Sequence, residues 1–154
     1  MNLQTKDVMN RAVIACVPDA RLEDIVRTLA ENEISGLPVI DARRQVVGII
    51  SESDLLFADE IEPPKMKTAL FGLYIESERV MNRMAEVRGV LAHDVMRTNV
   101  LTCHPQTPLR EVAQTLHDHK IKRLPVVNEA GELVGIVSRA DIIRALAQQM
   151  PSSQ

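Results

Sequence analysis

The sequence predicts an α+β protein built from two tandem copies of one strand–helix–strand–strand–helix unit. The first observation is an internal repeat: after a shift of 87 residues, 6–56 aligns without a gap with 93–143, and 18 of the 51 aligned pairs are identical. About three identities are expected by chance. The second is a helical spacing of apolar residues in each copy, and the third is a pair of short apolar runs behind it. A unit of roughly fifty residues buries only about 60% of its surface alone, so we expect the copies to pack on each other around a pseudo-twofold axis.

Each copy is expected to open with a short strand, over 12–17 and 100–103, that ends at a proline. A helix should follow, because apolar residues recur at i, i+3, i+4 and i+7 from Leu22 and from Leu109. In the second copy, Thr107 before Pro108 predicts an N-cap and a proline in the first turn.

Two short apolar runs then predict a hairpin in each copy, with a turn of a few residues between the strands. The runs are 37–40 and 46–50 in the first copy, and 124–127 and 133–137 in the second. After Ser51 and Ser138 the pattern is helical again.

The repeat divides the chain into four expected parts: a first repeat over 1–56, an insert over 57–92, a second repeat over 93–149 and a tail over 150–154. The insert contains Pro63-Pro64, an expected helix around Val80 and all three aromatic residues, Phe57, Phe71 and Tyr74. We interpret the aromatic residues as a lid over the module or as part of a dimer surface. Direct stacking on a ligand base is the alternative.

Charge and composition argue against several kinds of partner. The formal net charge of -3 provides no basic surface for nucleic acid or anionic lipid. No apolar stretch approaches the ~18 residues that span a bilayer, and the first ten residues lack a signal-peptide pattern, so we expect a cytoplasmic protein with neither nucleic acid nor membrane as partner.

Cys16 and Cys103 occupy equivalent apolar positions and are interpreted as small core residues. His117 and His119 are two residues apart and face different sides of a helix, so no metal site is expected.

The sharpest motif is Gly-x-x-Ser-x-x-Asp, which occurs at 48–54 and 135–141 where a strand turns directly into a helix. In one interpretation the serine and aspartate form a capping box at the helix start. The same geometry leaves amides and a hydroxyl that can receive a phosphate, and a carboxylate that can accept both hydroxyls of a ribose. Capping and nucleotide binding are compatible, so both interpretations stay open.

Two tandem units that open with Asp-Val-Met, continue through an apolar-Pro-Val-apolar run and reach Gly-x-x-Ser-x-x-Asp resemble a pair of CBS domains. This Bateman module is a regulatory module first described in cystathionine beta-synthase, and the likeness is to its stand-alone bacterial type. The resemblance covers 6–56 and 93–148. It implies clefts between the two repeats that bind AMP, ADP, ATP or S-adenosylmethionine, assembly as a homodimer, and no required cofactor or metal.

The resemblance also implies the residues of two ligand sites. Asp54 and Asp141 would each hold a ribose diol, with a serine near phosphate and main chain along the base. For the Asp141 site the implied lining is Ser138, Ile136, Lys122, Met9, Ala12, Ile14, Ile34 and Ser35. For the Asp54 site it is Ser51, Ile49, Arg123, Met96, Asn99, Leu101 and Ile121.

Lys122-Arg123 stands where the first copy has Ser35-Gly36, and both basic residues are where relatives of this kind place phosphate ligands. A guanidinium contacts phosphate in a bidentate, charge-assisted manner. The alternative is a solvated helix end, where cations offset the helix dipole.

No nucleophile with a partnering base is evident, and there is no Walker-type or dinucleotide-binding glycine loop, so we expect no enzyme and assign no catalytic residue. We expect a regulatory, ligand-sensing module whose ligand-dependent change signals to an unidentified effector protein. The alternative is a ligand-independent dimerisation scaffold for an enzyme or transporter. An enzyme that acts on a nucleotide is the third possibility.

Overall fold

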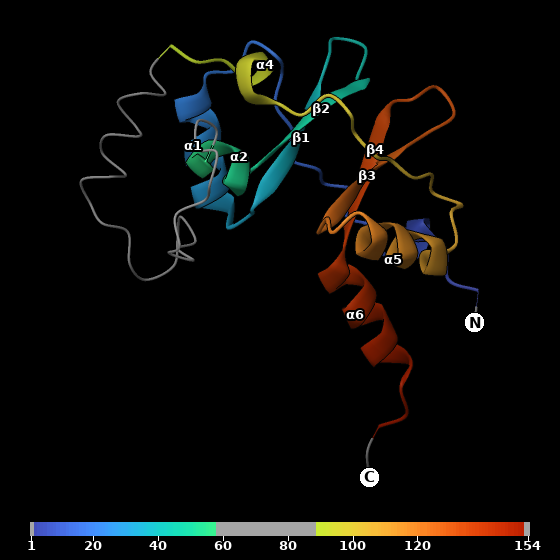
Figure 1. Cartoon of the computed structure of the whole chain (residues 1–154). Coiled ribbons are helices and arrows are strands. Elements are labelled where there is room, and N and C mark those ends of the chain that lie inside the picture. The colour runs from blue at the N-terminus through green and yellow to red at the C-terminus, as the bar shows by residue number, and fades with distance from the viewer. Residues whose placement is uncertain (1, 58–88, 153–154) are drawn as a thin grey trace. The chain divides into compact units, whose positions relative to one another are not determined.

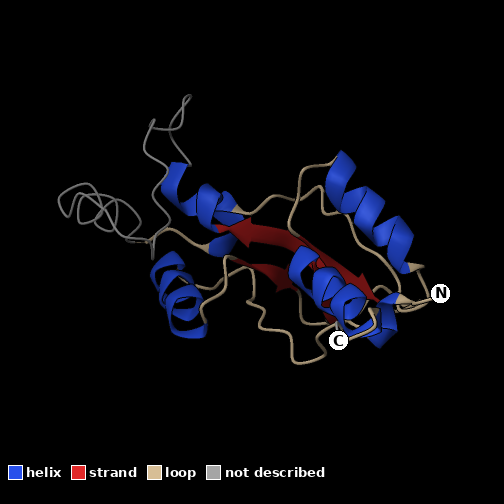
Figure 2. Cartoon of the chain, turned by 90° about the horizontal axis from the view of Figure 1, so that it is seen from below, coloured by secondary structure: helices blue, strands red, loops and turns tan. Residues whose placement is uncertain are grey.

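The computed structural model describes residues 2–57 and 89–152 (Figure 1). The chain divides into two compact units: unit 1 contains Met1–Val13, Arg43–Val46 and Leu101–Gln154, and unit 2 contains Ile14–Ala42 and Val47–Val100. Each unit combines helices with a two-stranded sheet, as the colours of Figure 2 show. The mixed α+β class predicted from the repeat is confirmed.

Unit 2 is built mainly from the first repeat. Helix α1 (Leu22–Asn32) precedes strands β1 (Gly36–Ile40) and β2 (Val46–Ser51), which pair with each other, and helix α2 (Glu52–Phe57) follows β2 directly. The short helix α4 (Ala92–Val95) comes from the start of the second repeat. The core contains Leu22, Ile25, Leu29, Leu37, Val39, Ile50, Leu55 and Ala92.

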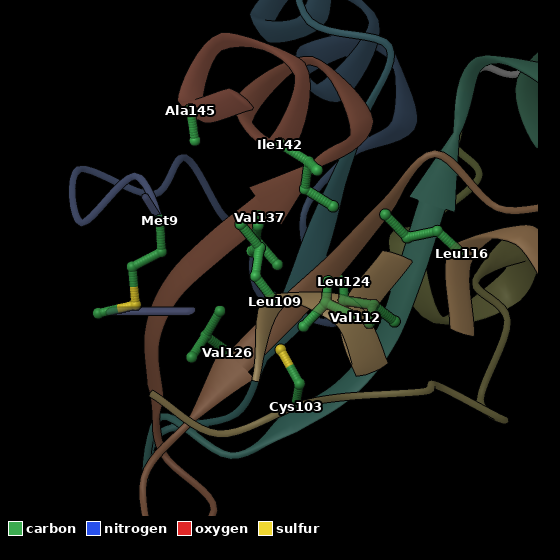
Figure 3. Packing of buried hydrophobic residues seen from close by; sticks show 10 residues of the cluster. All are labelled: Met9, Cys103, Leu109, Val112, Leu116, Leu124, Val126, Val137, Ile142 and Ala145. Atoms are coloured by element: carbon green, nitrogen blue, oxygen red, sulfur yellow. The ribbon is translucent and has the colours of Figure 1, made fainter. Parts of the chain in front are cut away.

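Unit 1 repeats this arrangement with the second repeat. A 3-10 helix, η1 (Thr5–Asp7), belongs to it together with α5 (Leu109–Asp118), β3 (Arg123–Val127), β4 (Leu133–Ser138) and α6 (Arg139–Gln149). Strands β3 and β4 are antiparallel, with Arg123 opposite Ser138 and an irregularity between Val126 and Val127. The core, drawn in Figure 3, contains Met9, Cys103, Leu109, Val112, Leu116, Leu124, Val126, Val137, Ile142 and Ala145.

The opening segment of each repeat packs on the hairpin of the other repeat. Met9 is buried in the core of unit 1, and Asn10 exchanges two backbone hydrogen bonds with Ile136, of 2.8 and 2.9 Å. In unit 2, Ala92 is buried and Arg97 exchanges two hydrogen bonds of 3.0 Å with Ile49. A compact unit is therefore not the same stretch of chain as a sequence repeat.

The strands expected over 12–17 and 100–103 are much shorter than predicted. Each is reduced to a single parallel bridge, between Cys16 and Val39 and between Cys103 and Val126. The prolines at 18 and 105 lack the N–H that would continue the pairing. Only the residue two positions before each proline therefore joins the edge of the sheet.

The N-cap expected at Thr107 is also wrong. Helix α5 begins at Leu109, with Pro108 as its N-cap and no side-chain cap. The Thr107 hydroxyl instead accepts a hydrogen bond of 3.0 Å from the backbone N–H of His104. Thr107 thus closes the turn that leads from the bridge at Cys103 into the helix.

The expected insert falls largely on residues 58–88, which are not among the described residues. The lid interpretation, the Pro63-Pro64 pair, Phe71, Tyr74 and the helix expected around Val80 all lie there. They stay predictions.

Candidate functional site

Asp141 is the third residue of α6, and its carboxylate caps the helix. Its Oδ2 accepts hydrogen bonds from the backbone N–H of Ser138 (2.8 Å) and from the Ser138 hydroxyl (2.9 Å). The amide of Asp141 donates to the same hydroxyl over 3.3 Å, which completes a capping box. The capping interpretation of this motif is confirmed.

Asp54 has the same role at the start of α2. Its Oδ2 accepts from the N–H and the hydroxyl of Ser51, both at 2.9 Å. The two aspartate side chains are only 9% (Asp54) and 15% (Asp141) exposed. Neither carboxylate is turned into bulk solvent, and in each the cap uses one oxygen and leaves the other for a second partner.

The second oxygen has a different partner in each unit. Oδ1 of Asp54 accepts a hydrogen bond of 2.8 Å from Nε of Arg97, which is 43 residues away in sequence. Oδ1 of Asp141 is paired with Arg144, one turn further along the same helix. The two repeats thus present equivalent carboxylates in unequal electrostatic surroundings.

The glycine of the motif makes room for the methionine of Asp-Val-Met. A Cβ added at Gly48 would lie 2.5 Å from Sδ and 2.8 Å from Cγ of Met96. A Cβ at Gly135 would lie 2.7 Å from Sδ of Met9 and 3.3 Å from the Asn10 carbonyl oxygen. Real atoms do not approach so closely, so only a glycine fits beneath each methionine. The Asp-Val-Met motif supplies the methionine side chain, and the Gly-x-x-Ser-x-x-Asp motif supplies the glycine backbone that this side chain covers.

The aspartate of Asp-Val-Met has a structural role of its own. Oδ2 of Asp7 accepts from the N–H of Gln4 at 2.9 Å, and Oδ2 of Asp94 accepts from the N–H of Leu91 at 2.8 Å. Each closes a short helical turn that holds the following methionine against the sheet. These carboxylates are caps of the same kind as Asp54 and Asp141, at a different place.

A family model described as CBS domain matches residues 6–60 and 92–148. The chain belongs to the CBS domain family. It is 34% identical over 157 residues to the uncharacterized protein MJ1426 of Methanocaldococcus jannaschii, which covers 92% of this chain and 89% of that protein. It is 32% identical over 136 residues to the chloroplastic CBS domain-containing protein CBSX1 of Arabidopsis thaliana; the match covers 85% of this chain and 58% of CBSX1.

Solved CBS pairs have the same fold. The crystal structure of CBSX2 from Arabidopsis thaliana superimposes with a TM-score of 0.81 at 28% identity, over 96% of each chain. A structure of CBSX2 in complex with AMP superimposes with a TM-score of 0.73 at 28% identity, over 94% of this chain and 96% of that one.

Some residues of each expected site lie together within one unit of this CBS pair. Asp141, Ser138, Ile136 and Met9 lie in unit 1, together with Lys122, whose carbonyl accepts the N–H of Arg139 at 3.0 Å. Asp54, Ser51, Ile49 and Met96 lie in unit 2. Ala12 lies in unit 1 and Asn99 in unit 2, on the chain that continues from Met9 and from Met96.

The other expected lining residues belong to the opposite unit. For the Asp141 site these are Ile14, Ile34 and Ser35, which lie in unit 2, and for the Asp54 site they are Leu101, Ile121 and Arg123, which lie in unit 1. Their contact with a ligand stays a prediction.

Sequence reasoning missed the two arginines that pair with the capping carboxylates of this CBS pair. Arg97 has a detectable signal, because the equivalent residue of the first repeat is Asn10. Arg144 follows Asp141 by three residues, a spacing at which helical side chains meet.

The cysteines of the CBS repeats are free thiols, and Cys103 is buried. Burial raises the pKa of Cys16 and of Cys103 from 9.0 to about 11, so both are protonated at neutral pH and make poor nucleophiles. Within residues 2–57 and 89–152 there is no group of three His, Cys, Asp or Glu side chains that could hold a metal ion. No helix in this part of the chain is long and apolar enough to cross a membrane.

Proposed function

We propose that this CBS pair is a regulatory module that binds an adenosine-containing nucleotide and signals its binding to a partner protein. The observation that carries the proposal is the duplicated Ser-Asp arrangement, with a shielded carboxylate that keeps one oxygen outside the cap in each unit. It is supported by CBSX2, a relative at 28% identity described in complex with AMP. AMP is therefore the first ligand to test, ahead of ADP, ATP and S-adenosylmethionine.

The chemistry of the carboxylate suits a ribose diol. An ionised carboxylate offers about four lone-pair sites. The cap occupies Oδ2, and a neighbouring arginine occupies Oδ1. The serine N–H and hydroxyl use both lone pairs of Oδ2. A ribose can donate its two hydroxyls to the two lone pairs of Oδ1 once the arginine moves aside, so the helix cap survives ligand binding.

The proposed role is binding without reaction. The hydroxyl of Ser138 donates to Asp141 and accepts from the Asp141 amide, so the cap already uses it. Both thiols have a pKa of about 11 and are protonated at neutral pH. A group that binds a diol and is not itself activated senses the ligand and leaves it unchanged.

Calorimetry with AMP on the full chain tests the ribose contact. Charge-assisted hydrogen bonds are worth about 1.5 to 3 kcal/mol each, so Asp141→Ala should weaken binding at that site by at least about tenfold. Asp118→Ala is the matched control, because it also removes a hydrogen-bonded carboxylate from unit 1, here one that accepts from Gln114, and lies outside the expected site. Equal loss in both variants, or no loss in Asp141→Ala, would contradict the ribose role.

A thermal-shift series separates the sensor from the alternative of a ligand-independent scaffold. A ligand at about 100 times its dissociation constant adds about 2.7 kcal/mol to the free energy of unfolding. The proposal expects a higher melting temperature with AMP or a related nucleotide. A melting temperature that no adenosine ligand changes would favour the scaffold.

We also propose that two copies associate through α6. Ile143 and Leu146 are 64% and 52% exposed, and their spacing places them on one face of the helix, while Ile142 and Ala145 face the core. Met150, the C-cap residue that follows the helix, is 71% exposed. Such an apolar stripe on a charged surface is typical of a protein contact. Sedimentation should show a wild-type dimer, a monomer for Leu146→Glu and a dimer for Gln148→Glu on the same helix. A monomeric wild type would contradict the proposal.

A further inference from the structure

Arg97 is held at its backbone and exposed at its side chain. Its N–H and carbonyl both pair with Ile49, each at 3.0 Å, so its Cα lies beside the strand that leads into the Asp54 cap. Its side chain is 67% exposed, and its Nε donates to Oδ1 of Asp54 at 2.8 Å. The backbone of Arg97 is therefore held by β2, and its guanidinium is exposed next to the oxygen that a ribose would need.

A ligand that binds Asp54 must displace this guanidinium. The displacement leaves neither group without a partner, because the ribose hydroxyls then donate to the shielded carboxylate and the exposed guanidinium is free to contact water or phosphate. Ligands differ in what the guanidinium of Arg97 contacts after it has left Asp54. An uncharged nucleoside returns the guanidinium to water, whereas a nucleoside phosphate offers a bidentate, charge-assisted partner within the same bound molecule.

We infer that Arg97 makes the Asp54 site selective for phosphorylated over uncharged adenosine ligands. Arg97 neutralises the Asp54 carboxylate while the ribose is absent and turns to the phosphate when a nucleotide binds. This role rests on the proposed function and assigns to a specific residue the selectivity of one of its two sites.

The Asp141 site in unit 1 lacks an arginine at the equivalent place. The residue there is Asn10, whose side-chain oxygen accepts the N–H of Ala12 at 2.9 Å. Asp141 is paired instead with Arg144 of its own helix. The preference that comes from Arg97 thus applies to the Asp54 site alone, and the two sites should discriminate differently between adenosine and AMP.

The test is calorimetry with adenosine and with AMP in the Asp141→Ala background, in which the Asp54 site is the remaining one. The quantity measured is the dissociation constant for adenosine divided by that for AMP. Arg97→Gln should lower this ratio about tenfold, because one charge-assisted contact to phosphate is lost, and Arg97→Lys should keep most of it. The matched control is Arg27→Gln, which removes an exposed arginine paired with Asp24 in the same unit.

An unchanged ratio in Arg97→Gln would overturn the inference, and so would an equal fall in Arg27→Gln, since that would be a general effect of net charge. Melting temperatures check that each variant is folded. If the wild type binds neither adenosine nor AMP, the proposed function fails as well. If it binds AMP and only the ratio stays constant, the role of Arg97 fails alone.

Discussion

At the scale of the residue, the pairing of a glycine with a methionine explains why two motifs, far apart in the chain, are both duplicated. Gly48 is covered by Met96, and Gly135 by Met9, at distances that a Cβ would not allow. Neither residue has a clear role when its own neighbours in sequence are considered. Together they bring the opening segment against the strand that leads into the cap.

Gly48→Ala should therefore destabilise the protein by about 1 to 3 kcal/mol, the usual cost of overpacking a close contact. Met96→Ala in the same chain should recover part of this loss, because it removes the Sδ and Cγ atoms that the new methyl group meets. Urea unfolding of both single variants and the double variant measures the coupling. Losses that simply add would contradict the steric explanation.

At the scale of the element, helices α1 and α5 end alike although their terminal residues differ. Glu33 after α1 and Lys120 after α5 have φ angles of 52° and 54°, in the left-handed region. The next residues, Ile34 and Ile121, donate to Leu29 and Leu116 over 3.1 and 3.0 Å and pack against the cores. This is a Schellman ending, in which glycine is the usual left-handed residue.

Glu33→Gly should raise the free energy of unfolding by about 0.5 to 1 kcal/mol, because glycine adopts positive φ without the strain of a Cβ. Ala30→Gly is the control: this residue is inside α1, where glycine should cost about 1 kcal/mol. Chemical unfolding of the two variants gives the comparison. A loss of similar size in both would contradict the strain at Glu33.

At the scale of the whole molecule, each compact unit depends on a segment from the opposite repeat. Met9 completes the core of unit 1, and the N–H groups of Thr5 and Lys6 donate to Thr107 and Pro105 over 3.0 and 2.8 Å. Val95 and Met96 of the second repeat pack against the core of unit 2 in the same manner. Neither repeat can bury its core with its own contiguous residues.

A change in the first repeat should therefore weaken the second. Met9→Ala should cost about 2 to 5 kcal/mol in unit 1, since it empties a buried position. Hydrogen exchange should become faster at Val126 and Val137, which share that core, and stay near its wild-type rate at Val39 in unit 2. Faster exchange at Val39 alone would contradict the exchange of segments.

Local patterns predicted most of the elements and the caps. The helical stripes from Leu22 and Leu109, both hairpins, the capping box of Ser138 and Asp141 and the cap that Asp54 forms with Ser51 are present, because each depends on residues a few positions apart. The first strands and the Thr107 cap were predicted from the same kind of pattern and are wrong. Pairing on a sheet edge and the course of a turn depend on contacts outside the local segment.

The sequence alone determined that the chain is a duplicated α+β module with a serine and an aspartate at each strand-to-helix junction. The repeat is found by aligning the chain with itself, and each cap depends on residues only a few positions apart. Only the tertiary structure decided which partners those carboxylates meet. Arg97 reaches Asp54 because the chain returns across β2, and Met9 joins the second repeat because its hairpin exposes a glycine there. Such contacts join residues distant in sequence, and their energy depends on packing that no short pattern encodes.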